Sequence, residues 1–412
     1  MTAARVARGF TRDRLTVSLY GAFVVWGWYV YAFSPTVPLI ADELDISRAV
    51  AGLHGTAMAV GAVTSGLVAP PLALRLGRRT VFLTGVAVLV AGIALLVLGP
   101  GLAGTLAGSG VAAVGGNLVI MAAQPALSVH HGLAGPSAVT EGNGFGSGIG
   151  LLAPLAVGGS VSLGLGWRPA VALTVVLAAL AAVLLATAPR APALLPAPPV
   201  EHGSLPTGRP RYQPALWFFL VAMICGIAIE TGTAMWAPDL LTSRAGAPAS
   251  VATAAVSGLV LGMTCGRFVV GPLAARKAPE KLLLVGFALA GLGWLVLWLA
   301  TSPAVALAGL FVAGLGYGSH YPLGQALVLR ASEGRPDQAQ GLSQLGAGVA
   351  VGLAPFVLGA LADAAGIHQA FLVVAGLIVV GGVAVALGLR AVHRRNDAGS
   401  PDDAGTTGVV RA

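Results

Sequence analysis

Charged residues are scarce in this sequence. Only 9% of its 412 residues are Asp, Glu, Lys or Arg, whereas 56% are hydrophobic. A soluble domain carries about 25% charged residues, and a surface that faces water cannot be built from far fewer. The composition therefore excludes an ordinary soluble protein and predicts a chain whose surface mostly faces lipid.

Cysteine and the common catalytic motifs are missing as well. The sequence has two cysteines, without the spacing of a metal site. It contains no His-Glu-x-x-His and no Gly-x-x-x-x-Gly-Lys-Ser/Thr, which argues against a zinc hydrolase and against ATP hydrolysis. Ten-residue alternation of apolar and polar residues, typical of membrane strands, does not recur. We therefore expect helices, no enzymatic activity, no metal and no cofactor.

Long stretches with almost no charge fill the rest of the chain. They are long enough for twelve helices of about 20 residues, the length that crosses a bilayer. Six helices fall in residues 15–41, 49–74, 80–140, 142–167 and 169–189. Six more fall in residues 212–243, 245–275, 282–329, 339–362 and 364–389. Only Glu230, Asp239 and Arg267 interrupt these stretches.

The basic residues predict the orientation of these helices. Nineteen Lys and Arg residues fall in loops and tails on one side of the predicted membrane, and three fall on the other. Because cytoplasmic loops carry the excess of basic residues, both termini are predicted to be cytoplasmic. The net charge of +8 is thereby explained without a nucleic-acid partner.

The chain divides into two similar halves. A Pro-rich stretch at 190–213 predicts a cytoplasmic linker between six-helix bundles at 1–189 and 214–395, and residues 396–412 predict a disordered tail. The halves match at a shift of 201 residues. The matching pairs include Pro71 and Pro272, Gly85 and Gly286, Gly115 and Gly316, Gln124 and Gln325, Pro154 and Pro355, and Gly158 and Gly359. We predict an all-α integral membrane protein of two pseudo-symmetric bundles.

With this plan, the sequence resembles the major facilitator superfamily over nearly its whole length. The family signature after the second span runs Gly-x-Leu-x-Asp-Arg-x-Gly-Arg-Arg, and residues 70–79 read PPLALRLGRR. The resemblance implies a gating loop that contains Arg75, Gly77, Arg78 and Arg79. Leu74 stands where the family has an acidic residue, so the charge relay of that residue is missing here.

Two branches of this family are the most similar. Residues 266–273, GRFVVGPL, resemble the eighth span of oxalate–formate and monocarboxylate carriers, in which an Arg meets a carboxylate. Glu230, Trp236 and Arg267 together also resemble sugar carriers related to fucose–proton symporters. The sequence leaves both branches open.

Charged residues in the middle of a span need a reason, because an ionised side chain there costs roughly 2.5–3.5 kcal/mol. Arg267 and Glu230 both lie deep in their predicted spans. We interpret Arg267 as a binding site for an anionic group and Glu230 as a proton carrier. The alternative is a structural ion pair between the two.

Polar residues inside other spans predict the remainder of a site near the membrane centre. The candidates for substrate binding, besides Arg267, are Asn117, Gln124, Tyr317, His320 and Gln325. Each of them has the alternative of a hydrogen bond to a neighbouring helix. His320 is a second candidate for the proton carrier.

Residues near the ends of the spans have less specific interpretations. We expect Glu141 in the first turn of a helix, and Asp239 and Asp363 to be solvated. Ser47 is predicted to cap the second span. Pro35 and Pro38 predict a break in the first span.

Together these observations predict a secondary transporter in the bacterial cytoplasmic membrane. We expect it to move a small polar or anionic organic solute by alternating access, coupled to protons and working as a monomer. The alternative is an exporter of a drug or secondary metabolite.

Overall fold

Helices form all the regular structure in the part of the chain that the computed structural model describes, residues 11–189, 191–196, 213–274, 276–332 and 336–398. The helices of the first half are α1 (Arg14–Phe33), α2 (Val37–Leu44), α3 (Arg48–Leu76), α4 (Arg78–Leu98), α5 (Gly101–His131), α6 (Gly135–Gly150), α7 (Leu152–Ser162) and α8 (Arg168–Ala186). Those of the second half are α9 (Pro214–Ala245), α10 (Ala249–Ala274), α11 (Pro279–Leu299), α12 (Pro303–Arg330), α13 (Pro336–Ala365), α14 (Ile367–Ala370) and α15 (Leu372–Ala398).

Twelve helical segments among these residues are long and apolar enough to cross a membrane, which confirms the predicted all-helical membrane fold. The first segment is broken as expected, because a short 3-10 helix, Ser34–Thr36, separates α1 from α2 beside Pro35. Ser47 caps α3 by accepting a hydrogen bond from the backbone N–H of Val50, at 3.2 Å, and this prediction is also confirmed.

The internal repeat has a direct structural counterpart. A Cβ added at Gly85 of α4 would lie 2.9 Å from the carbonyl oxygen of Gly115 on α5. At the matching place in the second half, a Cβ at Gly286 of α11 would lie 3.3 Å from the carbonyl oxygen of Gly316 on α12. Helices that approach so closely need small residues at the contact. The two halves are therefore built on the same close helix contacts.

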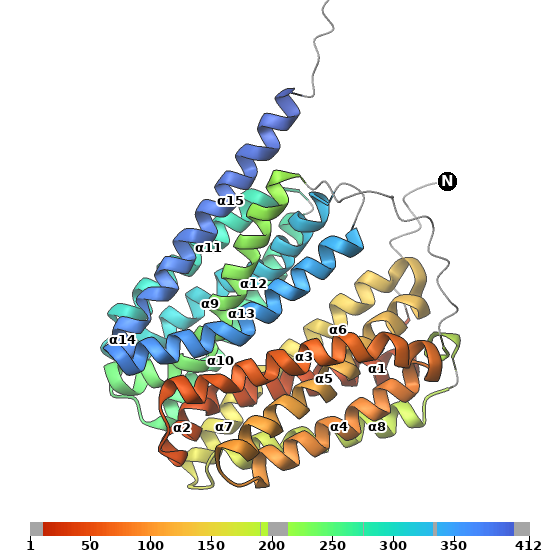
Figure 1. Ribbon diagram of the computed structural model, residues 1–412, viewed down its shortest axis with the longest axis horizontal. Coiled ribbons are helices and arrows are strands. Elements are labelled where there is room, and N and C mark those ends of the chain that lie inside the picture. The colour runs from red at the N-terminus through yellow and green to blue at the C-terminus, as the bar shows by residue number, and fades with distance from the viewer. Residues whose placement is uncertain (1–10, 190, 197–212, 275, 333–335, 399–412) are drawn as a thin grey trace, which may run out of the picture.

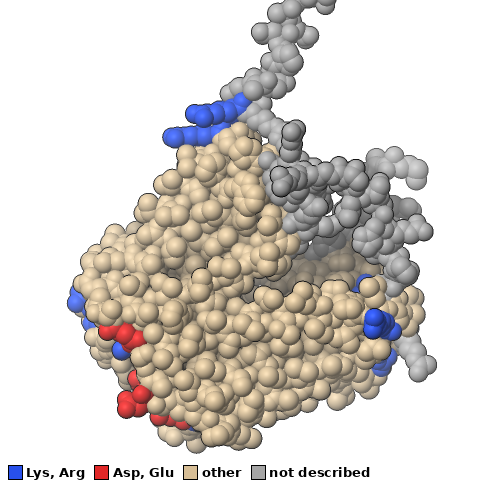
Figure 2. Space-filling model, viewed as in Figure 1, with Lys and Arg blue, Asp and Glu red and all other residues tan. Residues whose placement is uncertain are grey.

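The two bundles meet at one end of the molecule and diverge toward the other (Figure 1). We call the end where α1 begins and α15 stops the terminal face, and the opposite end, where α3 begins, the distal face. Lys and Arg side chains are seen at the terminal face, and acidic side chains, with some basic ones beside them, are seen toward the distal face (Figure 2). The orientation of these faces in a membrane stays a prediction.

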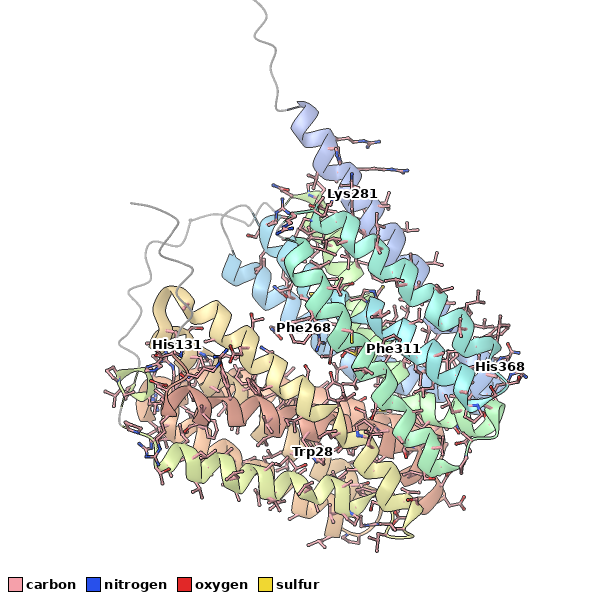
Figure 3. The ribbon with its side chains drawn as sticks, turned by 180° about the vertical axis from the view of Figure 1, so that it is seen from behind. Trp28, His131, Phe268, Lys281, Phe311 and His368 are labelled. Carbon is pink, nitrogen blue, oxygen red and sulfur yellow. The ribbon has the colours of Figure 1, made fainter. Side chains whose placement is uncertain are left out.

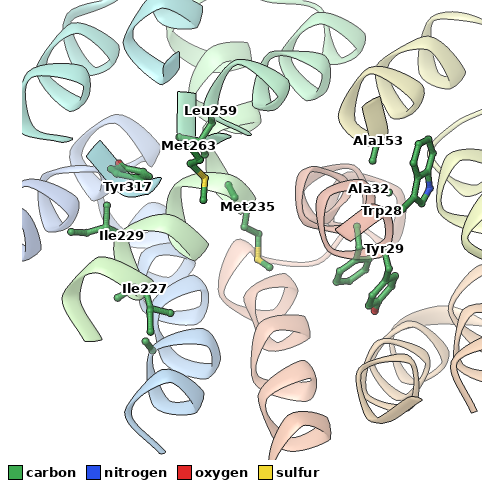
Figure 4. Packing of buried hydrophobic residues seen from close by; sticks show 14 of the residues in the cluster. Trp28, Tyr29, Ala32, Ala153, Ile227, Ile229, Met235, Leu259, Met263 and Tyr317 are labelled. Carbon is green, nitrogen blue, oxygen red and sulfur yellow. The ribbon is translucent and has the colours of Figure 1, made fainter. Parts of the chain in front are cut away.

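Buried apolar side chains fill each bundle. Trp28 and Tyr29 of α1 are buried in the first half, and Met235 of α9 and Met263 of α10 in the second (Figure 4). Trp28 also donates a hydrogen bond from Nε1 to the carbonyl oxygen of Ala170, at 3.0 Å. This donor therefore loses no hydrogen bond when it is buried.

Parts of the predicted linker and tail lie outside the described residues. These are residues 190 and 197–212 of the linker 190–213, and 399–412 of the tail 396–412. Within the linker, Pro192–Leu194 form a single turn of 3-10 helix. The helix α15 continues to Ala398, three residues into the predicted tail. The division into bundles at 1–189 and 214–395 stays a prediction.

Candidate functional site

A cavity of about 580 Å³ lies between the two halves, bordered by α5, α6, α10 and α12. We call it the main cavity. Its lining extends from Ser147 and Gly318, well inside their helices, to Ala274, the last residue of α10 at the terminal face. Its polar lining consists of Gln124, Thr140, Asn143, Ser147, Thr264, Arg267 and Tyr321.

Arg267 is the one cation in the lining of the main cavity as described, and it comes from α10. Its side chain donates a hydrogen bond from an Nη atom to Ser147 Oγ on α6, at 3.1 Å, and so spans the two halves. Tyr31 of α1 also lies within hydrogen-bonding reach of Arg267. A planar guanidinium has several donors, so donors remain for a carboxylate or phosphate.

Glu230 lies halfway along α9, close to the same arginine. Among the described residues, Glu230 and Arg267 form no ion pair with each other. Tyr31 is near enough to interact electrostatically with both of them, and Tyr317 interacts with Glu230 in the same way. A carboxyl, a guanidinium and two phenols from four helices are thus gathered in one region.

The other predicted binding residues divide into two groups. Gln124 of α5 lines the main cavity. Asn117, Tyr317, His320 and Gln325 are outside that lining. The amide of Asn117 donates to the carbonyl oxygen of Ala113 on its own helix, at 2.8 Å, and Gln325 is partly buried on α12.

The two buried rings of α12 pack inside the second half. The hydroxyl of Tyr317 lies 3.2 Å from Thr233 Oγ1 on α9. The imidazole of His320 stacks on Phe287 of α11, with ring centroids 4.1 Å apart. These contacts suit a packing role for both rings.

Several residues of the main cavity were not singled out as candidates from the sequence. Ser147, Thr264 and Thr140 are single polar residues in long helices. A serine or threonine inside a span gives no signal of its own, because its meaning depends on which helix it faces. Only Ser147 had an available clue, since it follows the polar Asn143 by one helical turn on a glycine-rich segment.

The predicted gating loop joins α3 to α4 at the terminal face. Gly77 has a φ of 82°, which a glycine adopts without strain. Arg78 donates to the carbonyl oxygen of Ala193, at 2.9 Å, and Arg79 to that of Ala186 at the end of α8. Arg75 is exposed at the end of α3. The loop is therefore held against its own half, and its role in gating stays a proposal.

The distal face is closed by contacts between the halves. Asp363 of α13 accepts hydrogen bonds from the backbone N–H groups of Arg48, at 2.9 Å, and Ala49, at 2.7 Å. These are the first two residues of α3, whose N–H groups have no partner within their own helix. Asp239 of α9 accepts two further bonds from the Arg48 side chain, at 2.5 and 3.2 Å. The prediction that these residues are solvated is therefore wrong for Asp239, which is partly buried, whereas Asp363 is exposed as expected and in addition binds the start of α3.

Glu141 also departs from its predicted role. The helix α6 begins at Gly135, so Glu141 lies in its second turn and not at its start. Its carboxylate accepts two hydrogen bonds from Arg12, at 2.5 and 3.0 Å. The first-turn prediction failed because residues 132–137, which read as a loop, form helical turns.

Comparison with known proteins places this geometry in a family. The model of the Major Facilitator Superfamily matches residues 17–277 and 234–411. No curated protein matches the sequence at a significant level.

Solved structures of transporters have a similar fold. A bacterial homologue of the human lysosomal transporter Spinster, in an inward-facing and occupied conformation, has a TM-score of 0.78 at 15% identity. The match covers 94% of this chain and 99% of that one. A variant of the nucleoside transporter NupG has a TM-score of 0.75 at 15% identity, and the match covers 91% of this chain and 98% of that one. A variant of the peptide transporter POT has a TM-score of 0.69 at 14% identity, and the match covers 93% of this chain and 99% of that one.

Proposed function

The chain belongs to the major facilitator superfamily, and we propose that it is a secondary active transporter of a small polar or anionic organic solute. The observation that carries this proposal is the position of Arg267. It lines a cavity between the two halves, donates a hydrogen bond to Ser147 and has several further guanidinium donors. Arg binds planar anions through two parallel hydrogen bonds, so a carboxylate is the best match.

Transport would proceed by alternating access. The main cavity reaches the terminal face, and the distal face is closed by Arg48, Asp239 and Asp363. If basic loops mark the cytoplasm, the terminal face is cytoplasmic and the observed state faces inward. Breaking the distal contacts and closing the terminal side would expose Arg267 to the other side of a bacterial cytoplasmic membrane.

Glu230 is our candidate for the proton carrier. It lies near Arg267 without an ion pair to it, and a protonated Glu230 would leave the cation free to hold the substrate. An anion would thus bind most favourably when Glu230 holds a proton, which couples the two fluxes. We expect a monomer to suffice, because both halves of the same chain contribute residues to the lining of the cavity.

The test is uptake into proteoliposomes that contain the full-length protein, with a panel of carboxylates, sugars and hydrophobic drugs, with and without a pH gradient. We expect carboxylate uptake that Arg267→Ala abolishes. Arg276→Ala, two residues beyond α10 and exposed, is the matched control and should transport normally. Glu230→Gln should lose acceleration by the pH gradient while keeping exchange of substrate. Normal carboxylate uptake by Arg267→Ala would refute the assignment.

A second candidate is an exporter of a drug or secondary metabolite. The observation in its favour is an apolar cavity that includes the exposed rings of Phe145 and Phe268. Drug efflux that does not change in Arg267→Ala would support this candidate over the first.

A further inference from the structure

A second cavity, of about 710 Å³, lies beside the main cavity between α6 and α10. We call it the α6–α10 groove. It is lined by Thr140, Glu141, Gly144, Phe145, Gly148, Ile149 and Phe268. Thr140, Gly144 and Phe268 also line the main cavity. The two cavities therefore adjoin along these three residues, and a ligand bound at Arg267 lies next to the groove.

Two glycines keep the groove open. Gly144 and Gly148 are four residues apart and so lie on one face of α6. A Cβ added at either would have no atom within 4 Å, apart from its immediate neighbours. Most other glycines in these helices differ, because a neighbouring helix packs directly on them. The space beside Gly144 and Gly148 is thus left unfilled by the protein itself.

Large apolar side chains form the walls of the groove. Phe145 of α6 is 50% exposed and Phe268 of α10 is 69% exposed. Phe268 lies on the side of α10 that faces α6 (Figure 3). The two exposed rings form the sides of the groove, and Gly144 and Gly148 form its floor. Apolar surface on three sides favours the binding of a narrow, flexible apolar group.

The polar lining of the main cavity and the apolar lining of the groove come from consecutive residues of the same helices. Ser147 lines the main cavity and its neighbour Gly148 lines the groove. Likewise Arg267 lines the main cavity, and the next residue, Phe268, lines both. An anion held by Arg267 and Ser147 would therefore have its attached chain at the mouth of the groove.

The acidic residue of the groove does not present a free negative charge. Glu141 lies toward the terminal face, and both of its oxygens accept hydrogen bonds from Arg12. An opposing charge at this distance compensates the carboxylate. An anionic ligand is consequently not repelled from the groove by a bare carboxylate.

We propose that the substrate is a single-chain amphipathic anion, whose carboxylate binds Arg267 and Ser147 and whose alkyl chain lies in the α6–α10 groove. This proposal rests on the proposed function and narrows its substrate class. The open space beside Gly144 and Gly148 admits the alkyl chain, and Phe145 and Phe268 pack on its two sides. A short carboxylate would use the cation alone and bind more weakly.

The experiment is binding to the full-length protein in lipid nanodiscs at about pH 6, where a free alkanoate is already ionised and protonation of Glu230 is less disfavoured than at alkaline pH. Bound radiolabelled decanoate is displaced by butanoate, hexanoate, octanoate or decanoate, and binding to empty nanodiscs is subtracted. Each added methylene should improve the affinity by about threefold. Decylammonium, with the same chain and the opposite charge, should not compete.

Variants that fill or keep the open space distinguish the groove from its surroundings. Gly148→Leu should weaken decanoate by at least about tenfold, the loss of two or more buried methylenes, and leave butanoate unchanged. Gly159→Leu is the matched control, because Gly159 of α7 also has open space around it but lies outside the groove. It should bind both ligands like the wild type. A thermal melt of each variant checks folding.

The outcomes separate this inference from the proposed function. Affinity that is independent of chain length, or is equally reduced by Gly148→Leu and Gly159→Leu, overturns the groove and leaves the transporter of small anions. Carboxylate binding that is unchanged in Arg267→Ala overturns the anion site itself. Absence of decanoate binding above the empty-nanodisc level overturns the groove proposal.

Discussion

Two interfaces between the halves are related by the internal repeat, yet they differ in how they are held. At the first, α3 packs on α13, and Gly359 of α13 contacts the backbone of Arg48. At the second, α7 packs on α10, and the matching Gly158 contacts the backbone of Ser250. Among the contacts of the described residues, charged hydrogen bonds are found at the first interface, where Asp363 and Asp239 bind Arg48. At the second, Ser162, which matches Asp363, bonds within its own helix.

This difference shows that the same backbone contact can be reinforced by charge in one half of the repeat and left without charge in the other. The α3–α13 interface is tied by charged hydrogen bonds and by Thr56, which donates to the carbonyl oxygen of Gly352 at 2.6 Å. The α7–α10 interface relies on small residues and a bond from Ser257 to the carbonyl oxygen of Leu151, at 2.9 Å. Next to it, α6 and α10 separate to form the groove. The less firmly held interface is therefore the one beside the candidate site.

The largest effect is expected from the shared glycine contacts. Gly359→Val and Gly158→Val each place atoms onto the backbone of the facing helix, and overpacking of this kind costs about 1–3 kcal/mol. We expect each to open the distal face and to lower transport by about tenfold or more. The opening is measured by the rate at which a thiol reagent labels a cysteine introduced in place of Thr56 or Ser257. Gly159→Val, beside Gly158 with open space around it, should label and transport like the wild type.

The next largest effect should be confined to the α3–α13 interface. Asp363→Ala removes the acceptor for two N–H groups of α3, and loss of a helix cap costs about 0.5–2 kcal/mol. Labelling of a cysteine at Thr56 should become several-fold faster, while labelling at Ser257 changes less. Ser47→Ala removes a cap of the same helix from within its own half. Equal acceleration by both variants would mean that Asp363 stabilises the helix and not the closed distal face.

A smaller effect should come from giving the second interface the charge that it lacks. Ser162→Asp places a carboxylate near the first turn of α10, where a negative charge contributes about 0.3–1 kcal/mol. We expect labelling of a cysteine at Ser257 to slow by about two- to fivefold. Ser162→Asn, which lacks the charge, separates electrostatics from hydrogen bonding. No slowing by Ser162→Asp would show that the two interfaces are not equivalent in geometry.

The smallest effect concerns the terminal end of the groove, where Arg12 holds Glu141 of α6 and the neighbouring Asp13 caps α1. Burial raises the pKa of Asp13, but hydrogen bonds from Thr16 and His130 outweigh it and lower the pKa to about 2. Because this pKa is below the unfolded value of about 3.9, the contribution is present above pH 4 and is lost as the pH falls toward 2.

Thermal unfolding in detergent checks this sign. Asp13→Asn should lower the unfolding temperature slightly at pH 6, because the residue is partly exposed and solvent screens it. The difference from the wild type should vanish as the pH falls from about 4 to about 2. A difference that grows in this range would contradict the depressed pKa.

Much of the fold could be predicted from the sequence, because the thickness and apolar nature of the bilayer fix the length and composition of every span. The charge-free stretches gave twelve helices, and the shift of 201 residues gave glycine pairs that pack alike. Arg267 was predictable as well, since a charge in mid-span must face a polar space. The local resemblance to the family added the loop around Gly77.

The side chains around Arg267 were less accessible. Asn117 and His320 are as polar in the sequence as Gln124, but only Gln124 faces the main cavity. Which face of a helix meets a cavity is decided by tertiary packing, and no helical period reveals it when all faces are apolar. The same reason hid Asp363, whose partner is 315 residues away.

The amides of Arg48 and Ala49 also give the molecule a built-in reporter. Their hydrogens are bound by a carboxylate that belongs to the opposite bundle, so protection from solvent exchange at these two sites depends on the bundles staying together. Deuterium uptake at the start of α3 would then follow the working cycle without any label or substitution. A ligand that stabilises the present arrangement should slow that uptake, and one that favours the opposite arrangement should accelerate it.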